Sequence, residues 1–248
     1  MNKSIQSLHD WFETPLGQYV LAREQAYFDQ VVADIFGFKA LQLGLAQYDF
    51  LRTNRMPYRC NAGSDGPVKL YADLEQLPLA SQSIDLLVLP HVLEFSRHPH
   101  QILREVERVL MPEGQVIISG FNPWSLWGLR RMLGAKGQGY PWCGDFINLL
   151  RLKDWLALLG FEMAAGKLCC YAPPFPSESW LQRCCFMEHA GDRWWAMAGG
   201  VYFLQAVKRV QGMRLITPKW QDGLLNNKAM APAARKVVNF RQANDNGQ

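Results

Sequence analysis

The chain alternates short apolar runs, typical of buried strands, with longer stretches in which apolar residues recur every three or four positions, as on one face of a helix. The run "SIDLLVLP" at 83–90 is the clearest strand, because a continuous apolar run of this length fits a strand buried on both faces. The same reasoning predicts strands at 39–43, 58–63, 68–73, 112–121, 161–172 and 199–210.

Helical spacing predicts helices at 4–36, 99–110, 122–133, 150–160 and around 179–189. Thr14 before Pro15 fits a capping residue with proline at the first helical position, and Asn122 before Pro123 repeats the pattern. Gly160 fits a helix stop. Strands that alternate with helices predict an α/β fold with a doubly wound, mostly parallel sheet.

We expect three parts along the chain: an N-terminal helical cap at 1–37, an α/β domain at 38–210 and a basic, disordered tail at 211–248. The formal net charge of +4 lies in that tail, which holds six basic and two acidic residues. The other 210 residues carry 20 of each sign, so the expected folded part has no net basic field and a nucleic-acid partner is disfavoured.

The sequence also bears on location and metals. The first residues contain no apolar core of signal-peptide length, and no run approaches the roughly 18 apolar residues of a membrane helix. We therefore expect a cytoplasmic protein without a membrane partner. The six cysteines include no C-x-x-C pair, which favours reduced thiols, and we expect no metal site.

Candidate chemistry lies where strands of such a sheet end. Residues 68–121, which include "YADLEQLP", "SIDLLVLPHVLEF" and "PEGQVIISGF", resemble the central block of class I S-adenosylmethionine-dependent methyltransferases, in the type-11 branch. The tract "LRLKDWLALLGFE" at 150–162 extends the match. The tracts at 11–25 and 120–131 are similar to one bacterial subgroup of that branch, with a degenerate glycine loop. The resemblance implies a seven-stranded, Rossmann-like methyltransferase fold that uses S-adenosylmethionine.

The resemblance also assigns residues to the cofactor. The family's Asp-x-Gly-x-Gly-x-Gly loop is reduced here: Gln42 stands at the acidic position, Gly44 at the first glycine and Ala46 at the second. Tyr48 stands at the third and is expected in the following helix. The acid that grips the ribose falls near Cys60 or Asn61, of which Asn61 could make one neutral hydrogen bond.

Further along the block, Asp73 matches the residue that accepts from the adenine amino group, and Leu74 the one whose N–H meets the ring. Pro90 and His91 would flank the sulfonium.

Two groups of residues are candidates for the reaction itself. His91 and Glu94 lie three apart, so they share a face, and His91 is the candidate base or acceptor-orienting group with Glu94 as its partner. The alternative is a wall histidine and a glutamate that complements a helix N-terminus. Asn122, Trp124, Trp127 and Tyr19 are expected to form the acceptor pocket; ordinary helix packing is the alternative for the aromatic residues.

The predicted function is methyl transfer from S-adenosylmethionine to a small-molecule acceptor that the sequence does not name. The alternative is a catalytically inactive methyltransferase fold that binds a ligand or a partner, because the glycine loop and the ribose acid depart from the family pattern. Fold alone does not separate the two.

Overall fold

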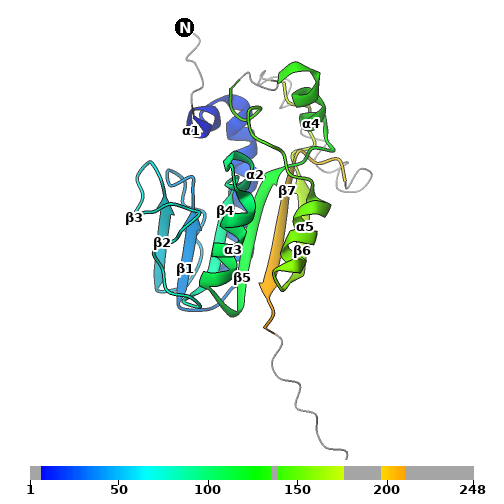
Figure 1. Ribbon diagram of the computed structural model, residues 1–248. Helices are drawn as coiled ribbons and strands as arrows, with labels where there is room; N and C mark the ends of the chain where they lie inside the picture. Colours follow the sequence, from blue (N-terminus) through cyan, green and yellow to red (C-terminus); the bar gives the residue numbers. More distant parts are fainter. Residues whose placement is uncertain (1–6, 136–138, 176–196, 211–248) are drawn as a thin grey trace, which may run out of the picture. The chain divides into compact units, whose positions relative to one another are not determined.

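The computed structural model describes residues 7–135, 139–175 and 197–210, which belong to one unit that ends at Val210. Its centre is a seven-stranded sheet with the order β3-β2-β1-β4-β5-β7-β6 (Figure 1). The strands are β1 (Lys39–Leu43), β2 (Tyr58–Gly63), β3 (Leu70–Tyr71), β4 (Ile84–Pro90), β5 (Leu110–Phe121), β6 (Phe161–Cys169) and β7 (Val201–Lys208). Strands β1 to β5 are parallel, and β7 runs antiparallel to both of its neighbours. The predicted doubly wound, mostly parallel sheet is confirmed.

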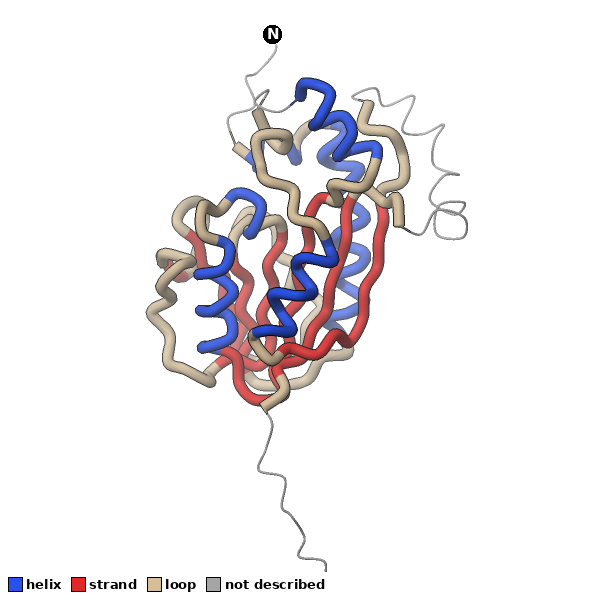
Figure 2. Tube along the Cα trace, turned by 45° about the vertical axis from the view of Figure 1, so that its right-hand side comes forward, coloured by secondary structure: helices blue, strands red, loops and turns tan. Residues whose placement is uncertain are grey.

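Helices lie on both faces of this sheet. The helices are α1 (Leu8–Phe12), α2 (Pro15–Ala33), α3 (Pro99–Val109), α4 (Leu126–Arg130) and α5 (Leu149–Leu158), with a 3₁₀ turn at Leu93–Phe95 and a wider helical turn at Arg131–Ala135. Figures 1 and 2 show α3 and α5 on one face, and Figure 1 shows α2 behind the sheet. The N-terminal helices therefore complete the layers of the α/β fold.

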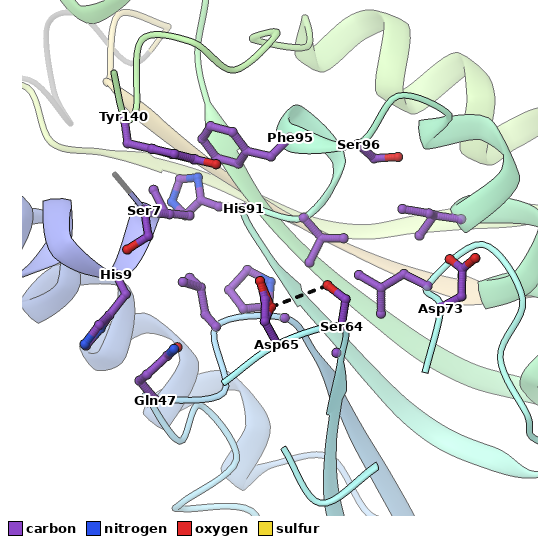
Figure 3. Close-up of a pocket in the computed structure, with 18 of the residues that line it drawn as sticks. Ser7, His9, Gln47, Ser64, Asp65, Asp73, His91, Phe95, Ser96 and Tyr140 are labelled. Atoms are coloured by element: carbon purple, nitrogen blue, oxygen red, sulfur yellow. Dashed lines mark hydrogen bonds between the residues drawn. The ribbon is translucent and has the colours of Figure 1, made fainter. Parts of the chain in front are cut away.

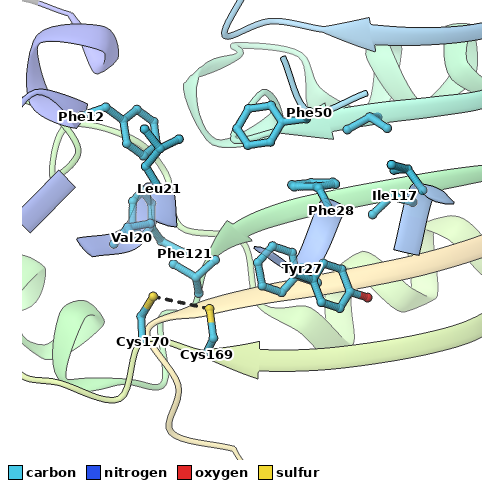
Figure 4. Close-up of a cluster of buried hydrophobic side chains, with 14 of the residues drawn as sticks. Phe12, Val20, Leu21, Tyr27, Phe28, Phe50, Ile117, Phe121, Cys169 and Cys170 are labelled. Carbon is cyan, nitrogen blue, oxygen red and sulfur yellow. Dashed lines mark hydrogen bonds between the residues drawn. The ribbon is translucent and has the colours of Figure 1, made fainter. Parts of the chain in front are cut away.

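Alternate residues of the central strands enter two separate cores, as the two-residue period of a strand requires. Leu86 and Val88 belong to a cluster with Phe28 of α2, part of which is drawn in Figure 4. Leu87 and Leu89 belong to a second cluster that contains the apolar faces of α3 and α5. A strand with buried residues on both faces explains the continuous apolar run at 83–90.

The helix ends follow local sequence signals, with one correction. The Thr14 hydroxyl accepts from the N–H of Gly17 at 3.1 Å, ahead of α2, as predicted. Gly160, at φ +82°, ends α5, also as predicted. The predicted cap at Asn122 was wrong, because α4 begins after Ser125, whose hydroxyl accepts from the N–H of Gly128 at 3.2 Å.

The structure corrects two further expectations. The segment between β1 and β2 contains turns and no helix, so Tyr48 lies in a turn. Only Leu70 and Tyr71 of the predicted strand at 68–73 pair with β2. The helix expected around 179–189 and the tail at 211–248 lie outside the described residues. Within the described part of the chain, no helix is long and apolar enough to cross a membrane.

Candidate functional site

A cavity of about 460 Å³ lies at the carboxyl ends of β1, β2 and β4 (Figure 3). The strand order reverses between β1 and β4, and open α/β sheets bind ligands at such a switch point. A cavity of this size is within the range of small-molecule sites. Of the residues predicted for the site, Gly44, Asp73, Leu74, Pro90 and His91 line it.

Gly44 forms the turn that leaves β1. Its φ is +74°, a conformation that glycine adopts without the strain that a side chain would meet. Its N–H donates to the carbonyl of Ala62 in β2 at 2.9 Å, which ties the turn to the next strand. A Cβ on Gly44 would lie 2.9 Å from Val92 Cγ2, so the missing side chain also keeps this end of the cavity open.

Gln42 is not available to a ligand, which corrects its assignment to cofactor binding. Its amide Nε2 donates to the carbonyls of Gly44, Leu45 and Tyr48 at 2.8–3.1 Å. Its Oε1 accepts from the N–H of Phe50 at 3.0 Å, and the residue is only 2% exposed. The side chain therefore holds the loop that follows β1.

Asn61 also lies outside the cavity. Its Oδ1 accepts from the N–H of Lys69 at 2.8 Å, and its amide faces the carbonyls of Ala46 and Pro67 at 3.4 Å. Asn61 borders a smaller hollow instead, and Ala46 does not line the main cavity either. The predicted roles of these two residues are therefore not supported by their positions.

The acid that sequence reasoning missed is Asp65. Strand β2 continues to Gly63, two residues past Asn61, so the residues that follow the strand are Ser64 and Asp65. Both line the cavity, and Asp65 Oδ1 lies 3.5 Å from the Ser64 hydroxyl (Figure 3). The signal was present in the sequence "NAGSDG" at the predicted end of the strand, but the family's spacing placed the acidic position near Cys60 or Asn61.

Asp73 brings a second carboxylate to the cavity, from the segment after β3. Its Oδ1 accepts from the N–H of Glu75 at 2.9 Å, which fixes the carboxylate in a turn. Among the described residues, its Oδ2 has no hydrogen-bond partner. Leu74 lies beside it, half-buried, on the cavity wall and packs against the core under α3.

His91, at the end of β4, is held between two buried carboxylates. Its Nδ1 lies 2.9 Å from Glu94 Oε2, and its Nε2 lies 2.7 Å from Oε1 of Glu24 in α2. All three residues are at most 3% exposed, and Glu94 also accepts from the N–H of Phe121. The predicted pairing of His91 with Glu94 is present, while Glu24, 67 positions away, was not foreseen.

The surroundings of His91 decide its charge. Burial alone would lower the pKa of the imidazole, but the carboxylates of Glu24 and Glu94 outweigh it and raise that pKa to about 10. A protonated imidazole with both nitrogens bonded to carboxylates cannot accept another proton. The prediction that His91 is the base is therefore corrected: it is part of a buried charged cluster.

His9 is a different imidazole at the cavity wall, and it comes from α1. Its Nε2 lies 3.6 Å from Glu13 Oε1, and its Nδ1 is buried without a hydrogen-bond partner among the described residues. Nothing in its sequence neighbourhood marks it as a site residue, because only the folded chain brings α1 over the cavity.

The residues expected to form an acceptor pocket do not come together. Asn122 is buried, and its amide donates to the carbonyls of Met197 and Gly199 at 3.0 Å. Trp127 is a core residue whose indole N–H donates to Ala172, and Tyr19 accepts from the N–H of Ala172. Trp124 is 75% exposed and borders another cavity. Trp127 and Tyr19 therefore follow the packing alternative, and Asn122 holds backbone carbonyls instead of lining a pocket.

Comparison with known proteins agrees with this architecture. Residues 47–118 match the type-11 family described as a methyltransferase domain. The fold is that of a class I methyltransferase. In the solved methyltransferase from Archaeoglobus fulgidus, described as SAM dependent, 95% of the chain aligns with 77% of this one at a TM-score of 0.55 and 15% identity. A corresponding enzyme from Mesorhizobium loti gives a TM-score of 0.54 at 16% identity, with 76% of this chain and 99% of that chain covered.

Curated relatives match over parts of their length. The protein YafS of Escherichia coli is 32% identical over 155 residues, covering 62% of this chain and 65% of YafS. A malonyl-[acyl-carrier protein] O-methyltransferase of Laribacter hongkongensis is 35% identical over 95 residues, covering 38% of this chain and 32% of that enzyme. The chain thus spans less than two thirds of the length of each of these two relatives. The resemblance to the type-11 methyltransferase domain that the sequence predicted is confirmed over residues 47–118, and the implied fold is confirmed, while the subgroup with a degenerate loop stays a prediction.

Proposed function

We propose that this protein transfers the methyl group of S-adenosylmethionine to a small-molecule acceptor. The observation that carries the proposal is a cavity at the switch point of a methyltransferase fold, lined by the Gly44 turn and by the carboxylates of Asp65 and Asp73. This arrangement retains the means to bind a nucleoside, so we favour an enzyme over the inactive alternative.

The residues present fit the cofactor. Asp65 would accept hydrogen bonds from the ribose hydroxyls, a role that the sequence had left to Asn61, and a charged acceptor makes bonds about twice as strong as a neutral one. Asp73 would accept from the adenine amino group through its unpartnered oxygen, with Leu74 beside the ring. Gly44 and Gly63, which both line the cavity, leave room for the ligand because neither has a side chain.

Bound S-adenosylmethionine supplies an electrophilic methyl group on a sulfonium. The protein has to place the acceptor in line with it and keep water out. Ser7, Leu8 and His9 line one side of the cavity, so the N-terminal segment helps to enclose it. A carboxylate acceptor needs no base, whereas a hydroxyl does. We assign the role of this base to His9, which would accept the proton of the hydroxyl, because His91 already carries a proton.

Calorimetric titration with S-adenosylmethionine and with its demethylated product tests the proposal. We expect saturable binding that weakens about tenfold in Asp65→Asn and in Asp73→Asn, since each loses a charge-assisted hydrogen bond. Asp154→Asn, at an exposed position on α5, is the matched control and should bind normally.

A folded protein that binds neither nucleoside would refute the proposal. Binding without turnover on any acceptor would instead favour the inactive alternative. Among substrates that turn over, the His9→Asn variant should methylate hydroxyl acceptors more slowly than the parent does, and other acceptors at the parent's rate.

A further inference from the structure

A second cavity, of about 670 Å³, lies beside the first at the N-terminal ends of α3 and α5. The two cavities share Ser96 and Arg97 in their walls. None of the roles proposed above for the cofactor uses the second cavity, and its lining has a different chemistry.

Positive charge dominates the wall of this second cavity. Its source is Arg97 and Arg151, which line the cavity together with His100, and all three are exposed. Neither arginine has a carboxylate partner among the described residues. The one acidic lining residue, Asp145, is already paired with Arg131 at 2.8 Å. The first turns of α3 and α5 hold no acidic residue either, so nothing local neutralises the two guanidinium groups.

Flat aromatic surfaces accompany these charges. Trp124, from the segment before α4, borders the cavity and is 75% exposed, although large apolar side chains are usually covered. Trp155 of α5 stands on the same wall, with the guanidinium of Arg151 5.0 Å from its ring centre and the His100 ring 3.8 Å away. Phe146 adds a third, half-buried ring.

We propose that the second cavity binds a small organic anion, a carboxylate or phosphate attached to a flat apolar group. Arginine binds either anion through two parallel N–H bonds, which suits Arg97 and Arg151. The apolar part would lie against Trp124 and Trp155, since tryptophan offers a large rigid contact surface. Because these charges are exposed, binding should weaken with salt. The proposal does not depend on methyl transfer.

The probe for the test is 8-anilinonaphthalene-1-sulfonate, an aromatic anion whose fluorescence reports binding to the full chain. We expect the double variant Arg97→Gln/Arg151→Gln to bind it about tenfold more weakly, the effect of losing charge-assisted bonds at an exposed site. The matched control, Arg104→Gln/Lys153→Gln, removes the same charge from positions on α3 and α5 outside the cavity and should bind as the parent does. Trp124→Ala should also weaken binding. Because the Trp124 side chain is exposed, this variant should still fold, so weaker binding would not reflect unfolding.

Neutral N-phenyl-1-naphthylamine separates the anion from the ring system, and its binding should not respond to the arginine substitutions. Competition by 1-naphthoate and by 1-naphthyl phosphate then tells which anion is preferred, while inorganic phosphate at the same concentration should compete poorly. Equal affinity of the arginine variant and its control for the anionic probe would overturn the proposal. The proposal would also be overturned if the arginine variant lost as much affinity for the neutral probe as for the anionic probe. Failure to bind S-adenosylmethionine would leave this result untouched, because no nucleoside is present in the assay.

Discussion

At the scale of single residues, the cluster of Glu24, His91 and Glu94 places charged groups in the buried part of the described chain. One imidazole is shared by two carboxylates, and Glu24 Oε2 is buried without a hydrogen-bond partner among the described residues. Removing one member of a buried ion pair commonly costs about 3–5 kcal/mol, because the other charge stays buried. The cluster links α2 to the end of β4 directly under the cavity and so holds that wall in place.

This cluster predicts a dependence of stability on pH. The pKa of His91 is about 10 in the folded protein and near 6.5 in an unfolded chain, so the folded state holds the proton more tightly. The stabilisation is complete below about pH 6.5 and is lost as the pH rises toward and through 10. Urea unfolding at a series of pH values should show the free energy of unfolding falling across this window.

Comparing the free energy of unfolding of the parent protein with that of His91→Gln separates the contribution of His91 from that of other groups that titrate near pH 10. The variant should be less stable at pH 6.5 and lose less stability on going to pH 10. His100→Gln, at an exposed histidine, is the control and should follow the parent. Parallel pH curves for the parent and His91→Gln would contradict the assigned charge.

At the scale of elements, the loop between β1 and β2 is held by hydrogen bonds rather than by a helix. Gln42 supplies four of them: its amide reaches three carbonyls of the loop and its oxygen holds the N–H of Phe50. Those bonds keep the Gly44 turn against the cavity. The residue at the family's acidic position therefore has a structural role here.

This role predicts that Gln42→Glu does harm, although it restores the acid of the family pattern. A carboxylate cannot donate, so the carbonyls of Gly44, Leu45 and Tyr48 lose their partner. We expect a loss of about 1–3 kcal/mol in the free energy of unfolding, the usual cost of leaving buried groups unpaired. Gln47→Glu makes the same change at an exposed position of the same loop and should shift stability by less than about 0.5 kcal/mol. Tighter cofactor binding by Gln42→Glu would show that the side chain faces the ligand after all.

At the scale of the whole molecule, the described sheet is completed by β7, which pairs with β5 on one side and with the edge strand β6 on the other. Strand β7 ends at Lys208, whose buried ammonium donates to the carbonyl of Leu110 at 3.1 Å and lies 2.8 Å from Glu107 Oε1. Every strand and helix described above lies at or before Lys208.

A chain that ends after Val210 should therefore keep the fold, with an unfolding free energy within about 1 kcal/mol of the full chain, because no described contact is removed. A chain that ends after Leu204 is the comparison. It loses the residues through which β7 pairs with Gln115 to Ile117 of β5 and with Phe161 to Ala165 of β6, and it should not fold. Circular dichroism and urea unfolding of the two chains measure the difference. If the chain that ends after Val210 failed to fold, residues 211–248 would be needed for the core.

Sequence reasoning located most of the fold because strands and helix ends are set by local patterns. The run at 83–90 became β4, the cap at Thr14 began α2, and Gly160 ended α5. It failed where two local signals competed. Ser125 caps α4 in place of Asn122, whose Oδ1 accepts from the N–H of Trp124 and whose Nδ2 donates to the distant carbonyls of Met197 and Gly199.

By itself, the sequence determined the order of the strands along the chain, the glycine turn at Gly44 and the presence of Asp73 beside a strand end, because each depends on neighbouring residues. Tertiary structure alone decided which polar atoms remain available. It consumed the amide of Gln42, locked a proton on His91 through Glu24, and turned Asp65 toward the cavity. The physical reason is that a hydrogen-bond partner or a buried charge can lie anywhere along the chain, and only folding brings the two together.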